Sequence, residues 1–85
     1  MSRRLKVLLF STAREAVGRS RIDLDLPTSV SNVREVVVLL GRDYPRLAGI
    51  LTSCRFARNG EYVHGWTARI RPGDEFAIHP PYSGG

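Results

Sequence analysis

The 85-residue sequence has little of several features that define common classes of small protein. A single cysteine, Cys54, excludes an internal disulfide and is typical of a reducing compartment. One thiol with His64 and His79, at no useful spacing, does not supply the clustered ligands of a metal site. We therefore expect no disulfide and no bound metal, and we interpret Cys54 as a small core residue.

Long apolar runs are also missing. The apolar stretch Val7–Phe10 follows Arg3 and Arg4, as in a secretion signal with twin arginines. The stretch is too short for such a signal, and Arg14-Glu15 follow at once. No other stretch is long enough to span a membrane. We expect a cytoplasmic protein.

Acidic residues are outnumbered: 8 Asp and Glu stand against 13 Lys and Arg, for a net charge of +5. Nearly all of the positive charge is arginine. The arginines are scattered, and no aromatic-rich stretch of the kind that binds RNA accompanies them. This distribution favours a solvated surface that is matched to an acidic protein partner. We expect neither a nucleic-acid nor a membrane partner.

The residues that are present indicate one small globular domain, with an apolar content of 42%. The nearly continuous apolar run in Leu5–Ser11 predicts a central strand, and strict alternation over Ile22–Leu26 predicts a half-buried one. The polar residues of Thr12–Ser20, with Gly18 among them, predict a turn or short loop. The two strands should therefore pair as an antiparallel hairpin.

The middle of the chain predicts one main helix, with Ser29 as its N-cap. The residues of its buried face share helical spacing: Val33, Val36, Val37, Leu40 and Tyr44. The β-branched run Val36–Val38 argues for a strand, but the periodic stretch is too long for one. Gly41 should weaken the last turn or end it early, and Pro45 should end the helix in any case. An irregular crossover is expected over Arg46–Ser53.

The last part of the chain predicts three strands. Arg55–Arg58 and Glu61–Val63 flank Asn59-Gly60, a strong hairpin signal. Arg71-Pro72-Gly73-Asp74 fits a type II turn that leads into a final strand, Glu75–His79. A helix between two hairpin-like halves must lie across one face of a sheet.

This order predicts an α+β fold with the β-grasp arrangement: a mixed sheet of about five strands, crossed by one main helix. The first and last strands should lie side by side and parallel in the middle. We assign residues 1–79 to this domain and residues 80–85 to an extended C-terminal tail.

The tail has the sequence Pro80-Pro81-Tyr82-Ser83-Gly84-Gly85. The two prolines cannot donate ladder hydrogen bonds, so they end the preceding strand. The two glycines make the end thin enough to enter a narrow channel. Its reactive group is the carboxylate of Gly85, which becomes an electrophile only when adenylation by ATP provides a leaving group. A sulfur nucleophile could then replace AMP.

A resemblance to a known family covers most of the chain. The segments that carry it are Lys6–Phe10, Ala13–Glu15 with Gly18, Phe56-Ala57, Glu61–Val63, Arg71–Ile78 and Pro80–Gly85. The Gly-Asp-Glu turn, one short strand, Pro-Pro and terminal Gly-Gly are specific in combination. The sequence resembles the small subunits of molybdopterin synthase, which are ubiquitin-like sulfur carriers.

This resemblance implies that an activating enzyme, an adenylyltransferase similar to the one that charges ubiquitin, consumes ATP to adenylate Gly85. The same residue then carries sulfur as a thiocarboxylate. The tail residues would insert into the large subunit, as part of a heterotetramer: Pro80, Pro81, Tyr82, Ser83 and Gly84. The large subunit would supply the catalytic side chains, and the sulfur would pass to a cyclic pterin precursor in molybdenum cofactor biosynthesis. The chain would bind no cofactor and would act as the sulfur-donating subunit of a sulfurtransferase.

Three residues are candidate contacts to the partner: Arg14, Phe76 and His79. Arg14 with Glu15 could instead form a surface ion pair, and both interpretations stay open. Phe76 and Ile78 are also predicted core residues. His79 departs from the large apolar residue that the family leads us to expect. It could make association depend on pH, or it could simply be an exposed histidine at the end of a strand.

Other functions fit the same sequence. A sulfur carrier for thiazole or cysteine biosynthesis would use identical chemistry at Gly85, although Pro80-Pro81 favour the molybdopterin assignment. A ubiquitin-like modifier would end in isopeptide bonds to lysines. A basic β-grasp module that binds RNA is a third alternative, and a steep salt dependence of RNA affinity would support it.

Overall fold

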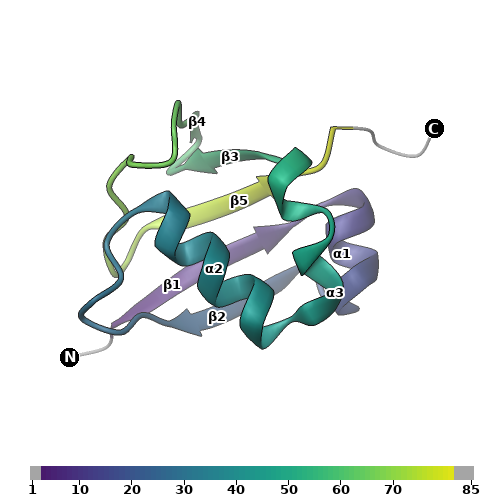
Figure 1. The fold of residues 1–85 in the computed structure, drawn as a ribbon, viewed down its shortest axis with the longest axis horizontal. Helices are drawn as coiled ribbons and strands as arrows, with labels where there is room; N and C mark the ends of the chain where they lie inside the picture. Colours follow the sequence, from purple (N-terminus) through teal and green to yellow (C-terminus); the bar gives the residue numbers. More distant parts are fainter. Residues whose placement is uncertain (1–2, 82–85) are drawn as a thin grey trace.

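The computed structural model describes residues 3–81, which form one five-stranded mixed sheet in the order β2-β1-β5-β3-β4. The strands are β1 (Arg4–Leu9), β2 (Arg21–Asp25), β3 (Arg55–Arg58), β4 (Glu61–Tyr62) and β5 (Glu75–His79). The helical segments are α1 (Ser11–Val17), α2 (Val33–Asp43), α3 (Pro45–Ala48) and the 3-10 turn η1 (Leu51–Ser53). Figure 1 shows α2 lying across one face of the sheet. The predicted β-grasp arrangement is confirmed.

The first and last strands lie side by side at the centre of the sheet, as the sequence predicts (Figure 1). β1 runs parallel to β5, with Val7 opposite Phe76, and antiparallel to β2, with Val7 opposite Ile22. A parallel pair needs a long crossover, which α2 and the segment after it provide. The end of β5 is thereby held in the middle of the sheet.

Two turns with positive φ angles shape the other half of the sheet. Asn59 and Gly60 have φ angles of 52° and 86°, as a type I′ hairpin requires. Gly73 has a φ of 90°, and the N–H of Asp74 donates to the carbonyl of Arg71 at 3.1 Å, as in the predicted type II turn. The side chain of Asn59 joins the two turns, because it donates to Asp74 at 3.0 Å and accepts from the N–H of Glu75 at 2.8 Å.

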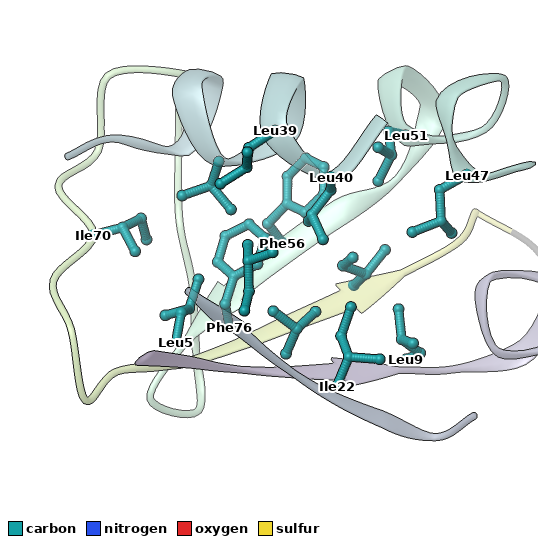
Figure 2. Close-up of a cluster of buried hydrophobic side chains, with 14 of the residues drawn as sticks. Leu5, Leu9, Ile22, Leu39, Leu40, Leu47, Leu51, Phe56, Ile70 and Phe76 are labelled. Atoms are coloured by element: carbon teal, nitrogen blue, oxygen red, sulfur yellow. The ribbon is translucent and has the colours of Figure 1, made fainter. Parts of the chain in front are cut away.

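The core lies between α2 and the sheet, where side chains from both layers meet (Figure 2). The rings of Phe56 and Phe76 stack in it with centroids 5.3 Å apart. The buried residues of α2 are Val33, Val36, Leu39 and Leu40. Helical spacing therefore identified the face, but Leu39 was missed. The predicted Val37 and Tyr44 are only half-buried at its border.

The prediction of a loop over Thr12–Ser20 is wrong, because α1 occupies Ser11–Val17. The helix has no side-chain N-cap, so the usual start signal is missing. Gly18 ends it in the left-handed conformation, with a φ of 82°, and donates to the carbonyl of Arg14 at 2.7 Å. The apolar spacing of Ala13, Ala16 and Val17 was the available signal for this helix.

The predicted start of the main helix is also wrong. Asn32, not Ser29, is the N-cap, because its side chain accepts from the N–H of Glu35 at 2.9 Å. The carboxylate of Glu35 reaches back to the N–H of Ser31 at 2.9 Å. The two reciprocal bonds satisfy N–H groups at the helix start, as in a capping box.

The crossover after α2 is more regular than predicted. The helix continues through Gly41 to Asp43, and Pro45 begins a second short helix, α3, instead of an irregular segment. Proline is favoured at a first helical position, because its missing N–H would have no partner there. Leu47 and Leu51 of this crossover are buried in the core.

Candidate functional site: the uncovered face of the sheet and the root of the tail

The sheet face opposite α2 carries a continuous apolar row. Leu8 pairs with Ala77, Ala77 with Ala57, and Ala57 with Tyr62, so the row crosses β1, β5, β3 and β4. Side chains of paired strand residues lie on the same face, while Phe76 and Ile78 point to the opposite one. The side chains at the centre of the row, Ala77 and Ala57, are small, and those at its two ends, Leu8 and Tyr62, are bulky. The uncovered face therefore has an apolar floor with raised borders.

Three rings gather at one end of this row. The imidazole of His79 stacks on Phe10, with centroids 4.7 Å apart and planes at 6°. Tyr62 meets the same imidazole edge-on at 5.7 Å. Phe10 and Tyr62 are 42% and 55% exposed. We call the apolar row together with these rings the open-face patch: Leu8, Phe10, Ala57, Tyr62, Ala77 and His79.

The open-face patch lies at the root of the tail. His79 is the last residue of β5, Pro80 after it is half-buried, and Pro81 is exposed. Tyr82, Ser83, Gly84 and Gly85 lie outside the described residues. The rings on both sides of His79 restrict its side chain, and the strand pairing fixes its backbone. The last strand residue before the prolines is thus anchored next to a surface of exposed rings.

The predicted partner contacts divide into two groups. His79 belongs to the open-face patch, and Arg14 is exposed on α1, with its N–H donating to the carbonyl of Phe10 at 3.4 Å. Within residues 3–81, no ion pair joins Arg14 to Glu15, so the ion-pair interpretation has no support. Phe76 is 0% exposed and has no surface to offer a partner. The expectation of a contact through Phe76 is therefore wrong, and its role as a core residue is confirmed.

Cys54 lines a hollow of about 430 Å³ that Tyr62 of the open-face patch also lines. It is half-buried against the core, and its thiol donates to the carbonyl of Ile50 at 3.2 Å. Burial raises the pKa of this thiol, because a thiolate is poorly solvated there. A raised pKa means less of the nucleophilic thiolate at neutral pH. The structure therefore agrees with the interpretation of Cys54 as a packing residue.

The part of the chain between residues 3 and 81 contains no group of three His, Cys, Asp or Glu side chains that could hold a metal ion. None of its helices is both long and apolar enough to cross a membrane. The stacked rings and small apolar side chains of the open-face patch offer contact area, which is the chemistry of recognition.

Sequence reasoning missed most of the open-face patch. The apolar run Val7–Phe10 predicts a central strand with limited exposure, whereas Leu8 is half-buried and Phe10 is exposed. The available signal was the alternation of β1, whose core side chains are Leu5, Val7 and Leu9. Tyr62 could be found only from the register of the β3–β4 hairpin. Its place beside His79 depends on strands that are far apart in the sequence.

Comparisons with known proteins agree with this architecture. The ThiS family model matches residues 7–85. The molybdopterin synthase sulfur carrier subunit of Dictyostelium discoideum is 36% identical over 86 residues, which cover 100% of both chains. The small archaeal modifier protein 1 of Methanosarcina acetivorans has a TM-score of 0.79 at 26% identity, over 100% of this chain and 99% of that one.

A further similarity is to a chain of the Helicobacter pylori complex of subunits 1 and 2 of the molybdopterin-converting factor. Its TM-score is 0.67 at 18% identity, over 96% of this chain and 99% of that one, which shows a shared fold. The full-length identity to the Dictyostelium subunit and the match to the family model carry the assignment further than the fold. The chain belongs to the ThiS family, among the molybdopterin synthase sulfur carrier subunits.

Proposed function

We propose that the chain carries sulfur on the carboxylate of Gly85 and donates it, as the small subunit of a molybdopterin synthase, to a cyclic pterin precursor. Support comes from the Dictyostelium subunit of that name, which matches over its whole length. The observation that carries the proposal for this chain is the open-face patch, an apolar surface at the root of the tail whose exposed rings are Phe10 and Tyr62. Such a surface can hold a partner while the tail reaches into it.

The chemistry starts with the carboxylate of Gly85. A carboxylate oxygen attacks the α-phosphorus of ATP on an activating enzyme, pyrophosphate leaves, and an acyl-adenylate forms. The outer sulfur of a donor-protein persulfide then attacks the acyl carbon, AMP leaves with the oxygen, and an acyl disulfide forms. A thiol, acting as reductant, attacks the donor's inner sulfur, forms a disulfide with it and releases the thiocarboxylate. One oxygen has been exchanged for one sulfur, and the thiocarboxylate is a soft anionic nucleophile. Carriage on the main-chain terminus divides a difficult transfer into easier steps and requires no catalytic side chain from this chain.

The partner that we propose for the open-face patch is the large subunit of the synthase. The Helicobacter pylori complex unites subunits 1 and 2 of a molybdopterin-converting factor, which supports a two-subunit arrangement. Stacked rings and a small apolar floor are typical of the central part of a protein interface. Pro80-Pro81 stiffen the exit from β5 and reduce the entropy that the tail loses in a channel. A heterotetramer and a cytoplasmic location remain predictions.

Mass spectrometry of the intact chain tests the proposal. After incubation with the activating enzyme, ATP and a sulfur donor, the mass should rise by one oxygen-for-sulfur exchange, and fragmentation should place the change on Gly85. Without ATP there should be no change, because a free carboxylate has no leaving group. The charged chain, mixed with the large subunit, should lose its sulfur only when the pterin precursor is present.

Two variants serve as controls. Deletion of Gly84 and Gly85 should abolish sulfur transfer with little change in Tm, because both residues lie beyond β5. The Cys54→Ser variant should still receive sulfur on Gly85. Sulfur on Cys54 in place of Gly85 would contradict the proposal, and a large drop in Tm on deletion would show that the glycines are structural.

A protein modifier is the second candidate function, and the similarity to the Methanosarcina modifier protein favours it. Its chemistry shares the adenylate of Gly85 but ends with a lysine amine as the attacking group. Isopeptide-linked products without any thiocarboxylate would select this function. A thiocarboxylate that is consumed by the pterin precursor would select the synthase.

A further inference from the structure

The outward side of α2 carries a stripe that neither the core nor the proposed function requires. Arg34, Val38 and Arg42 follow each other at intervals of four residues and are all exposed, so they lie on one side of the helix. Val38 is 66% exposed, the most of any large apolar side chain in the described part of the chain. A β-branched residue also disfavours the helix slightly. Local stability therefore does not account for its presence there.

A second apolar side chain joins this surface from a different segment. Trp66 is 42% exposed, and its carbonyl accepts the N–H of Arg34 at 2.9 Å. The carbonyl of Ala68 likewise accepts the N–H of Val33 at 3.0 Å. These two bonds tie the segment that carries Trp66 to the first turn of α2. The indole is thus held beside the stripe by backbone contacts.

Two hollows adjoin the stripe, and Val38 borders both of them. One has a volume of about 380 Å³ and is lined, besides the stripe, by Pro27, Ser29, Val30, Glu35 and Leu39. The other has a volume of about 370 Å³ and is lined by Val37, Thr52, Trp66, Arg34 and Val38. Val38 is therefore a ridge between two shallow depressions, and Arg34 borders both as well. A flat contact would not use this relief, whereas a side chain on each side of the ridge would.

The charges at the two ends of the stripe indicate what fits it. Within residues 3–81, Arg34 has no ion pair, because the neighbouring Glu35 is engaged by Ser31. Arg42 meets only the exposed carboxylate of Asp43, at 3.3 Å. The two guanidinium groups belong to residues eight positions apart, about 12 Å along a helix. Carboxylates at the same separation, with an apolar side chain between them, would complement the stripe.

We propose that the stripe Arg34–Val38–Arg42, with Trp66, is a second docking surface that takes an acidic amphipathic helix of a partner protein. The apolar ridge between the arginines favours a protein helix over a nucleic-acid backbone, which would place a charge where Val38 lies. Figure 1 shows α2 covering one face of the sheet, so the outward side of α2 and the open-face patch point in opposite directions. The two surfaces approach each other where Tyr62 and Trp66 line the same hollow of about 430 Å³. The inference does not rest on the proposed sulfur chemistry.

Nuclear magnetic resonance titration of the ¹⁵N-labelled full chain tests this surface. The probe is a synthetic helical peptide with two glutamates eight residues apart, a leucine midway, and alanine and glutamine elsewhere. We expect saturable shifts at Arg34, Val38, Arg42 and the indole N–H of Trp66. A peptide with glutamine in place of both glutamates should bind at least about tenfold more weakly. Raising the salt concentration from about 50 to about 300 mM should reduce the affinity for the glutamate peptide more than the affinity for the glutamine peptide.

Variants locate the surface and leave the fold intact, because the exposed side chains of the stripe contribute little to the core. The double variant Arg34→Glu, Arg42→Glu should bind the glutamate peptide at least about tenfold more weakly. It should instead bind a peptide with lysines in place of the two glutamates. Val38→Ser should weaken binding by about threefold or more, and Leu8→Ser on the opposite face of the sheet should have no effect. Equal binding of both peptides, shifts on the open-face patch, or binding that survives charge reversal would overturn the proposal. Stronger displacement by an oligouridine at the same residues would overturn it in favour of a nucleic-acid surface.

Discussion

The two faces of the sheet differ in what covers them. On one face, Phe76 and Ile78 are completely buried under α2. On the other face, the residue between them, Ala77, lies at the small centre of an apolar row that no helix of residues 3–81 crosses. Adjacent residues of one strand therefore serve opposite purposes. Large side chains face the protein's own helix, and small ones leave room for another molecule.

This difference separates stability from recognition within β5. Among residues 3–81, no polar or charged side chain is buried, so apolar packing alone stabilises the covered face. The open face places its exposed apolar area in rings at the root of the tail. A change on the covered face should reduce the free energy of unfolding, and a change on the open face should reduce affinity for a partner. Three predictions test this division, beginning with the largest effect.

Phe76→Ala should lower the free energy of unfolding by about 3–5 kcal/mol, because it leaves a cavity under α2 and removes the stack on Phe56. Urea denaturation of the purified domain measures this. At temperatures where the variant remains folded, its affinity for the large subunit should be nearly unchanged. A near-neutral result in urea would mean that the two faces of β5 are assigned the wrong way round.

Ala77→Glu should change affinity for the large subunit more than it changes the free energy of unfolding. A carboxylate in the middle of the apolar row would be left unpaired when a partner covers it. Affinity for the large subunit should fall about 30- to 100-fold, or about 2–2.7 kcal/mol. The free energy of unfolding should change by less than in Phe76→Ala, because no large core side chain is lost. Isothermal titration calorimetry with the large subunit provides the measurement, and unchanged affinity would exclude this face as the interface.

The order of strands and the turns could be predicted from the sequence, because they depend on local signals. The two turns need positive φ angles at Asn59, Gly60 and Gly73. The pairs Asn-Gly and Pro-Gly are local sequence signals for such turns. Alternation and helical periodicity then separate strands from the main helix. The parallel pairing of β1 with β5 follows once the helix must cross one sheet.

The open-face patch could not be predicted in the same way. His79 and Phe10 are far apart in the sequence, and their stacking depends on β1 and β5 ending at the same edge. The sequence also contains no capping signal for α1. This helix begins at Ser11, so the strand direction ends directly after Phe10. Phe76 was counted both as core and as contact because residue type alone does not say which face a strand residue occupies. Register decides this, and register is a property of the assembled sheet.

The third prediction concerns the ring stack. His79→Ala removes the partner of Phe10 and should weaken association about three- to tenfold, or about 0.7–1.4 kcal/mol. His79→Phe keeps a ring in place and should restore or exceed the original affinity. Equal affinity of the alanine and phenylalanine variants would show that the stack has no part in binding.

The smallest effect is expected at Cys54, which belongs to neither face of the comparison. Cys54→Ser should cost about 1 kcal/mol or less, because a hydroxyl can keep the bond to the carbonyl of Ile50 and only part of the side chain is buried. Association with the large subunit should be unchanged. The measurements are urea denaturation and titration, as for the other variants.

The thiol of Cys54 also has a distinctive dependence on pH. Its pKa is raised in the folded state by burial, so the folded protein holds the thiol proton more tightly than the unfolded chain does. The stabilisation is complete below about pH 8.5, where the unfolded thiol is protonated, and it is lost as the pH rises through the higher folded value. Iodoacetamide should therefore modify the native protein more slowly than the urea-unfolded chain at neutral pH, and Cys54→Ser should lose less stability than the original chain in alkaline solution. Rapid alkylation of the native protein at pH 7 would show instead that this thiol is reactive, and it would reopen the question of whether it takes part in sulfur relay.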